Sequence, residues 1–371
     1  MKIIISPDSF KGALRADKAA AALAAGWKSV RPGDEILQIP LSDGGEGLAS
    51  ALKKSLNGEV LPIPSPDALM REITAEVVVS GKKSAVIESA QANGIELLSK
   101  EELNPLAATT YGVGEILRYL LDAGYEDFII GIGGSATVDG GAGMLQALGA
   151  EFYDASGNLF PPGIGGGALH DVVKADFSHL HSKIKSGSIK VACDVTNPLC
   201  GDNGAAKIFG PQKGATPDMV AALDRNLLHY AKLCQYSGDA PGDGAAGGLG
   251  FALRNILGAE IVSGAELVME YSGFNAALPG SDLVITGEGC SDNQTAFGKL
   301  CACAAIKAHA HNVPVVLFSG ALRGETDDLE ALFDGCFSIA RGPCSLAEAM
   351  ADTEKNLYHA GANAARIAGK F

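Results

Sequence analysis

Residues 2–12 read KIIISPDSFKG, a short β-branched run that opens into a polar loop carrying Asp8 and Lys11. The alanine-rich residues 16–30 have helical character and stop at a Pro-Gly turn, and residues 35–39 read as a second strand. This order of strand, helix and strand predicts a βαβ unit with a functional loop after each strand.

The middle of the chain has a different pattern from its two ends. Residues 73–79 and 84–89 flank a Ser-Gly-Lys-Lys turn and predict a hairpin of antiparallel strands. Further strands are expected at 127–132, 189–193, 282–286, 313–318 and 336–339, and helices at 111–123, 219–234 and 346–368. The part after about residue 280 returns to short apolar strands separated by helices, as at the start of the chain.

The fold class that we predict is α/β with two lobes. Both chain ends (1–60 and 281–371) are expected to form one doubly wound, parallel-sheet lobe of the Rossmann or flavodoxin-like kind. Residues 61–280 are expected to form an inserted mixed α/β domain. The active site is then expected between the lobes, at the carboxyl ends of strands.

Composition excludes several classes of protein. The chain has 371 residues, 47% of them hydrophobic, and a formal net charge of −14, which argues against nucleic acid or an anionic membrane surface as a partner. The N-terminal apolar run is too short for a signal peptide, and no run of about eighteen apolar residues predicts a membrane span. The eight cysteines form no C-x-x-C pair, so we expect reduced thiols in a cytoplasmic protein.

Two Asp-Gly-Gly loops, at 43–45 and 139–141, each follow an apolar run. Glycine lets backbone amides gather around an anion, and the adjacent aspartate can hold a metal ion or accept a proton. Loops that offer amides to phosphate and carboxylates to Mg²⁺ indicate phosphoryl transfer. Asp43 is therefore expected to bind the metal, and the structural alternative is a glycine-rich turn before a helix.

Residues 131–136 (GIGGSA) follow a predicted strand and formally match the dinucleotide pattern G-x-G-x-x-A. This match leaves open an NAD(P)-dependent hydroxy-acid oxidoreductase. The loop is too glycine-rich for an ordinary first helical turn, and we interpret it as a cradle for nucleotide phosphates. The residues expected to bind the nucleotide are Gly133, Gly134, Ser135, Asp139, Gly140 and Gly141. The Walker A and protein-kinase motifs are missing from the sequence.

Two other loops after predicted strands carry candidate residues. Asp8 is a candidate metal ligand or orienting acid, and Lys11 is a candidate anchor for an anion. Asp194 and Asn197 are candidates for holding a small polyhydroxy acid, with Asp194 taking a hydroxyl proton. The alternative for Asp194 is a capped turn that Pro198 enforces.

The loop after the strand at 282–286 carries two more carboxylates. Glu288 and Asp292 are candidate metal-binding or base residues. Lys299 lies downstream, where it can neutralise negative charge.

Taken together, these segments resemble the bacterial type-1 class of the glycerate kinase family over essentially the whole chain. The segments that carry the resemblance are PDSFKG at 7–12, DGGEG at 43–47, GIGGSATVDGGAGMLQALG at 131–149, CDVTNPLCG at 193–201, FGPQKGAT at 209–216, GAAGGLG at 244–250, VITGEG at 284–289 and DNQT at 292–295. Ala13, Leu48 and Val138 differ from the residues usual in the family, and the run after Lys299 is more divergent. The resemblance implies a two-lobed α/β fold, ATP dependence and glycerate as substrate.

The resulting hypothesis is Mg²⁺-assisted phosphorylation of D-glycerate by ATP, for which the resemblance favours 2-phosphoglycerate as product. The residues assigned to it are Asp194, Lys11 and Asp8 for catalysis, Asn197, Glu288 and Lys299 for substrate binding, and Asp43 and Asp292 for the metal. A non-catalytic sensor of a sugar acid or nucleotide is a further alternative. The expected partners are ATP and glycerate, and a homodimer is left open.

Overall fold

The computed structural model describes residues 1–41, 48–81, 83–185, 187–292, 295, 300–324 and 327–369. The chain divides into two compact units, which we call unit 1 and unit 2. Unit 1 comprises Met1–Asp43, Ser50–Leu56 and Ala265–Phe371, and unit 2 comprises Gly44–Ala49 and Asn57–Gly264. The domain limits expected at residues 60 and 280 stay a prediction.

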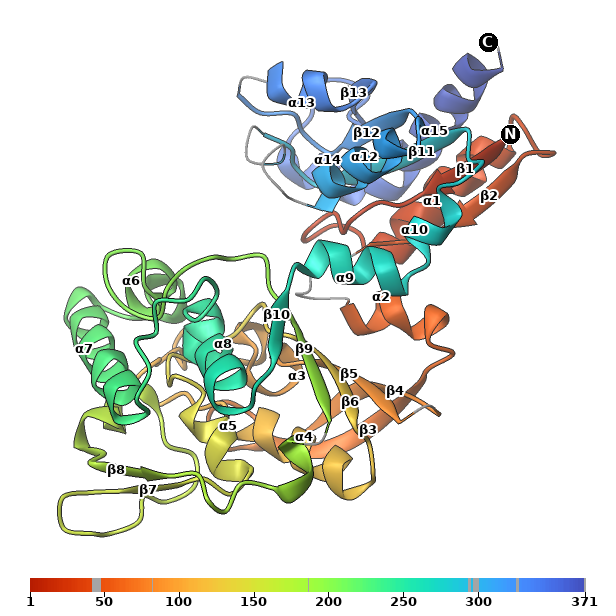
Figure 1. The fold of residues 1–371 in the computed structure, drawn as a ribbon. Coiled ribbons are helices and arrows are strands. Elements are labelled where there is room, and N and C mark those ends of the chain that lie inside the picture. The colour runs from red at the N-terminus through yellow and green to blue at the C-terminus, as the bar shows by residue number, and fades with distance from the viewer. Residues whose placement is uncertain are drawn as a thin grey trace. The chain divides into compact units, whose positions relative to one another are not determined.

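Unit 1 is built on a five-stranded sheet in which all neighbouring strands are parallel (Figure 1). The strands are β1 (Lys2–Ile5), β2 (Glu35–Gln38), β11 (Leu283–Glu288), β12 (Val315–Ser319) and β13 (Gly335–Ser338). Their order across the sheet is β13-β12-β11-β1-β2, which corresponds to the doubly wound order 2-1-3-4-5 of flavodoxin-like folds. The predicted parallel sheet from both chain ends is confirmed, and its strand order changes direction between β1 and β11.

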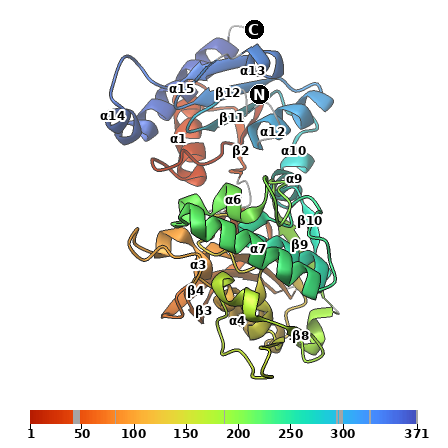
Figure 2. The same ribbon diagram turned by 90° about the vertical axis from the view of Figure 1, so that its left-hand side faces the viewer.

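Helices cover both faces of this sheet (Figure 2). The helices of unit 1 are α1 (Ala16–Lys28), α10 (Phe274–Ala277), α12 (Leu300–Ala310), α13 (Asp327–Leu332), α14 (Leu346–Ala351) and α15 (Thr353–Ala368), with most of α2 (Leu48–Ser55) and α9 (Gly264–Tyr271). Side chains alternate along a strand, and Ile285 of β11 packs in the core formed with α1 and α15. The next residue, Thr286, points to the opposite face, where its Oγ1 lies 3.4 Å from Cys301 Sγ of α12.

Helices α1 and α15 approach each other closely because glycines face the partner backbone. A Cβ atom on Gly26 would lie 1.9 Å from the carbonyl oxygen of Tyr358, and one on Gly361 would lie 2.2 Å from that of Leu23. Only glycine fits at these two positions. The prediction of one continuous helix over 346–368 is wrong, because Asp352 leaves the helical conformation and separates α14 from α15.

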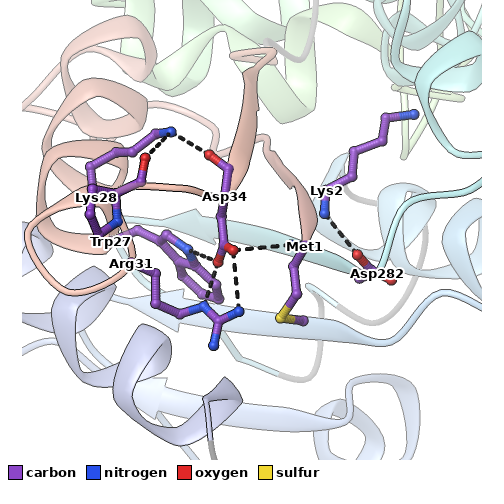
Figure 3. Close-up of polar contacts among 8 residues, drawn as sticks. Met1, Lys2, Trp27, Lys28, Arg31, Asp34 and Asp282 are labelled. Atoms are coloured by element: carbon purple, nitrogen blue, oxygen red, sulfur yellow. Dashed lines mark hydrogen bonds and ion pairs between the residues drawn. The ribbon is translucent and has the colours of Figure 1, made fainter.

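The connection between α1 and β2 is held by Asp34, which is 7% exposed (Figure 3). Its carboxylate accepts hydrogen bonds from Trp27 Nε1 (2.9 Å), from the Arg31 guanidinium (2.5 and 3.2 Å) and from the N-terminal amine of Met1 (3.0 Å). These donors, the Arg31 guanidinium above all, hold the pKa of Asp34 far below its usual range, although burial alone would raise it. Asp34 is therefore charged in the folded protein at neutral pH.

Unit 2 contains a six-stranded mixed sheet in the order β10-β9-β6-β5-β4-β3. The strands are β3 (Glu59–Pro66), β4 (Glu72–Ser80), β5 (Ser84–Glu88), β6 (Asp127–Gly131), β9 (Ser188–Ala192) and β10 (Glu260–Val262). Strands β4 and β5 pair antiparallel, with Val78 opposite Val86, which confirms the predicted hairpin. Strands β5, β6, β9 and β10 run parallel, so their carboxyl ends share one edge of the sheet.

The helices and small strands of unit 2 pack around one hydrophobic core. They are α3 (Ala90–Asn93), α4 (Tyr111–Asp122), α5 (Ala142–Ala147), α6 (Ala205–Phe209), α7 (Pro217–Leu233), α8 (Leu249–Phe251) and the pair β7 (Glu151–Tyr153) and β8 (Lys174–Asp176). Helix α7 begins after Thr216, whose hydroxyl accepts a hydrogen bond from the Met219 amide. None of the helices in the described ranges is both long and apolar enough to cross a membrane.

Candidate active site

The loops that follow β1 and β11 meet where the strand order of unit 1 changes direction. Beyond the strands, the Ser6 amide donates to the Ile285 carbonyl (2.7 Å) and the Asp8 amide to the Gly287 carbonyl (2.8 Å). A Cβ atom on Gly289 would lie 3.2 Å from the amide nitrogen of Lys11, so glycine permits the loops to touch. In doubly wound sheets this position is where ligands bind.

Asp8 and Glu288 lie on these two adjoining loops, because the Asp8 amide bonds to the carbonyl of Gly287, the residue before Glu288. Burial, followed by the negative charges of Glu288 and Asp8, raises the pKa of the buried Cys301 thiol well above its usual value, so both carboxylates act on one thiol. The Ser291 hydroxyl donates to Glu288 Oε1 (2.8 Å) and orients that carboxylate. We call Asp8, Lys11, Glu288, Ser291 and Asp292 the unit 1 edge.

The remaining residues expected near this edge are only partly described. Asp292 is half-buried, and its amide donates to Thr295 Oγ1 (3.2 Å) while the Thr295 amide donates to its carbonyl (2.8 Å). Asp43 and Lys299, expected to bind the metal and the substrate, lie outside the described residues. Their assignments stay predictions.

A second set of candidate residues lies where the parallel strands of unit 2 end. The Asp194 carboxylate follows β9 and is exposed, and its Oδ1 accepts hydrogen bonds from Ser263 Oγ and from the Gly264 amide, both at 2.9 Å. Asn197 is half-buried, and its Nδ2 donates to the Asn203 carbonyl (2.8 Å) and so shapes the same loop. We call Gly133, Gly134, Ser135, Asp194, Asn197 and Ser263 the unit 2 edge.

The loop after β6 turns at Gly133 and Gly134. Gly134 is exposed and has φ +71°, a left-handed conformation that suits glycine, and its carbonyl accepts a hydrogen bond from the Ile95 amide (2.8 Å). Among the described residues, none accepts a hydrogen bond from the amides of Gly133, Gly134 or Ser135. Such amides at an exposed turn can bind the oxygens of an anion.

The second half of this glycine-rich run lies inside unit 2. Asp139 is fully buried, and its carboxylate accepts hydrogen bonds from the amide and hydroxyl of Thr110 (2.8 and 2.7 Å) and from the Gly141 amide (3.1 Å). Burial raises the pKa of Asp139, and these donors oppose the rise. Gly140 and Gly141 are buried as well. A role for Asp139, Gly140 and Gly141 in nucleotide binding stays a prediction. The hydrogen bonds of the Asp139 carboxylate stabilise the conformation of this loop.

Lys213 is a residue of this site that the sequence analysis did not single out. It ends a 3-10 helix (Pro211–Lys213) and is 2% exposed, and its ammonium donates to Ser135 Oγ (2.8 Å) and to the Thr137 carbonyl (2.7 Å). Burial lowers the pKa of Lys213 to about 7, against the opposing effect of the Asp139 charge. The sequence signal was its place in FGPQKGAT, a lysine beside glycine in a segment that carries the family resemblance.

Comparisons with known proteins cover nearly the whole chain. The model of the glycerate kinase family matches residues 3–369. The glycerate 2-kinase of Escherichia coli (strain K12) is 42% identical, with 98% of this chain and 97% of the relative covered. The glycerate kinase of Bacillus subtilis (strain 168) is 43% identical, with coverage of 94% and 93%. A crystal structure described as glycerate kinase 2 from Salmonella typhimurium LT2 superposes with a TM-score of 0.88 at 40% identity, covering 100% of this chain and 98% of that one.

Proposed function

We infer that this chain, which belongs to the glycerate kinase family, is a kinase that uses ATP to phosphorylate glycerate. The observation that carries the inference is the match to the family and to named glycerate kinases over nearly the full length. An oxidoreductase was supported only by a short glycine pattern, and a non-catalytic sensor leaves the family match unexplained. Neither alternative is retained.

For the unit 2 edge, we propose that the amides of Gly133, Gly134 and Ser135 bind phosphate oxygens of the nucleotide, and that Asn197 helps to hold glycerate. The amides of this turn, at which Gly134 is exposed, have no acceptor among the described residues, and this supports the first assignment. We assign Asp194 as the group that orients the glycerate hydroxyl and takes its proton. An exposed carboxylate fixed by two hydrogen bonds on one oxygen supports this role.

The transfer itself needs little covalent help from the protein. The glycerate hydroxyl oxygen attacks the γ-phosphorus of ATP, the bond from that phosphorus to the bridging oxygen breaks, and ADP leaves while the hydroxyl proton passes to Asp194. Positioning and charge neutralisation account for most of the catalysis in such reactions. We propose oxygen 2 of D-glycerate as the acceptor, because a named relative is a glycerate 2-kinase.

For the unit 1 edge, we propose that Asp292 and Asp43 hold Mg²⁺ and that Asp8 is a further metal ligand or orienting acid. Lys11 compensates the negative charge that develops, and Glu288 and Lys299 contact the substrate. The donor set fits the ion, because Mg²⁺ prefers carboxylate oxygens and is bound by one or two of them together with phosphate. The negative charges of Glu288 and Asp8, which both raise the pKa of the Cys301 thiol, support the presence of two carboxylates near this edge. Among the described residues, no group of three or more metal-ligating side chains is found. When bound, the ion neutralises charge on the phosphates.

Some finer assignments also remain proposals. A cytoplasmic location is supported by the cysteines, for which the described part of the chain contains no disulfide. The two-domain division at residues 61 and 280 and a homodimer stay predictions.

The experiment that tests the function incubates purified protein with MgATP and D-glycerate, follows ADP release and assigns the product by ³¹P NMR. ADP release that depends on glycerate, with a 2-phosphoglycerate signal, is the expected result. A 3-phosphoglycerate signal would retain the kinase and overturn the position. No glycerate-dependent ADP would overturn the proposed function.

A further inference from the structure

We propose that Lys213 is a positioning residue of the phosphate-binding turn, which acts through Ser135 and supplies a buried positive charge beneath the nucleotide phosphates. This inference rests on the proposed function, because it takes the anion on the Gly133–Ser135 turn to be the nucleotide. It assigns a role to a residue whose contacts are otherwise only structural.

The Ser135 hydroxyl oxygen is held by the buried lysine. The Lys213 ammonium donates to Ser135 Oγ at 2.8 Å, so this oxygen acts as an acceptor towards the lysine. The Ser135 hydroxyl proton is not used in this bond and can be donated to an acceptor. Ser135 is itself 5% exposed, and it follows the exposed Gly134. The second bond of Lys213, to the Thr137 carbonyl, fixes the loop on the far side of Ser135. Lys213 therefore sets the direction in which this hydroxyl can donate.

The Lys213 ammonium is buried without a carboxylate as hydrogen-bond partner. Both hydrogen-bond acceptors of its ammonium are neutral oxygens, and among the described residues the carboxylate that affects its pKa is that of Asp139, without a hydrogen bond between them. The carboxylate of Asp139, which acts on Lys213 through space, takes its own hydrogen bonds from Thr110 and from loop amides. A buried ammonium without a contacting counter-charge is costly. An anion bound on the turn above it would remove that cost.

The other charged groups near Lys213 are engaged elsewhere or exposed. On the segment packed against Gly214, Glu102 pairs with Arg71 at 2.6 Å and Glu101 is exposed. On α6, Lys207 pairs with Asp202 at 2.6 Å at the surface. Asp139 is thus the charged group among the described residues that acts on the Lys213 ammonium.

A proton linkage follows from this environment. Burial holds the pKa of Lys213 at about 7, so the free protein carries this ammonium only partly protonated at neutral pH. A bound phosphate favours the charged form, and binding draws a proton from water on to Nζ. Affinity for the nucleotide should therefore fall as the pH rises above 7, by about tenfold or more between pH 7 and 9.

The test measures ADP binding to the full-length protein by isothermal titration calorimetry in two buffers of different ionisation enthalpy. We expect the wild type to take up a fraction of a proton per ADP at pH 7.5, and Lys213→Met to take up none and bind about 10- to 100-fold more weakly. Lys213→Arg keeps the charge but does not titrate in this range, so it should bind ADP without proton uptake. Lys232→Met, an exposed lysine of α7, is the matched control and should behave as wild type.

Ser135→Ala tests whether Lys213 acts through the Ser135 hydroxyl, and thermal unfolding checks that the variant is folded. This variant should weaken ADP binding while Lys213 and its burial are retained. Wild-type protein that phosphorylates glycerate but takes up no proton with ADP, or whose uptake persists in a folded Lys213→Met variant, would overturn the role of Lys213 alone. Absence of glycerate phosphorylation by the wild type would instead overturn the proposed function. Unchanged ADP affinity in Ser135→Ala would refute the action through Ser135.

Discussion

Replacing Asp194 by asparagine separates the charge of this side chain from the hydrogen bonds that hold it. In the structure, Oδ1 accepts from Ser263 Oγ and from the Gly264 amide, both at 2.9 Å. An asparagine amide oxygen can accept the same two bonds. The folded state should therefore change by no more than about 1 kcal/mol.

The effect on catalysis should be much larger. A positioned general base contributes about 10²- to 10⁴-fold to rate, and an amide cannot take the hydroxyl proton of glycerate. We expect kcat of Asp194→Asn to fall by that factor, which corresponds to about 3–5 kcal/mol in the activation free energy. The KM for ATP should change little, because the amides of the glycine turn are untouched.

The assay is a coupled measurement of ADP release with MgATP and D-glycerate, alongside thermal unfolding. Ser263→Ala is the control variant, because it removes one of the two hydrogen bonds to Asp194 Oδ1 and leaves the carboxylate in place. It should lower kcat by about tenfold or less. A folded Asp194→Asn enzyme with kcat within about threefold of wild type would remove Asp194 from the chemistry.

Three further variants have distinct expected outcomes. Asp34→Asn should lower the free energy of unfolding by about 2–3 kcal/mol at pH 7. The pKa of Asp34 is lowered in the folded protein, so its charge contributes fully to the free energy of unfolding above the unfolded pKa of about 4. This contribution decreases progressively as the pH falls from there towards the folded pKa. Urea unfolding at pH 7 and pH 3 should therefore show a smaller difference between variant and wild type at pH 3. Gly134→Ala introduces a Cβ with only a 3.6 Å contact but keeps φ at +71°, so it should cost about 1 kcal/mol and raise the KM for ATP several-fold, and an unchanged KM would argue against phosphate binding at this turn. Asp139→Asn places its amide NH₂ against a donor in either orientation, the Gly141 amide on one side or the Thr110 amide and hydroxyl on the other. It should cost about 2–3 kcal/mol, measured by chemical unfolding, and wild-type stability would refute the buried-acceptor role.

The parts of the fold that sequence predicted well are those whose signal is local. The isoleucines of β1 and the apolar run of β11 are short and continuous, and helical segments separate them from the next strands. Strand β3 was not predicted, because prolines at 62, 64 and 66 argue against a strand. It lies at the edge of its sheet and pairs only with β4 along its length, a position in which proline is tolerated.

The candidate site was predictable as a set of loops but not as a set of roles. Asp139 and Asp194 have the same chemistry in sequence, yet one is fully buried and the other is exposed at a strand end. Lys213 was missed for a related reason. A lysine beside glycine is expected to be exposed to solvent, but tertiary packing buries this one. Burial depends on contacts between residues far apart in the chain, such as Lys213 and Ser135, which no local pattern contains.

The strand order of unit 1 means that its sheet can be completed only late in translation. Strand β1 lies between β2 and β11, so one side of Ile3–Ile5 has no partner until Leu283 and the residues after it leave the ribosome. At about 5–20 residues per second, roughly 15–55 s separate the emergence of these two strands. Unit 2 is nearly continuous in sequence and can complete its sheet during that interval. The nascent chain therefore carries an apolar strand with one unpaired edge for most of its translation, and such an edge is prone to pair with other chains and to engage chaperones.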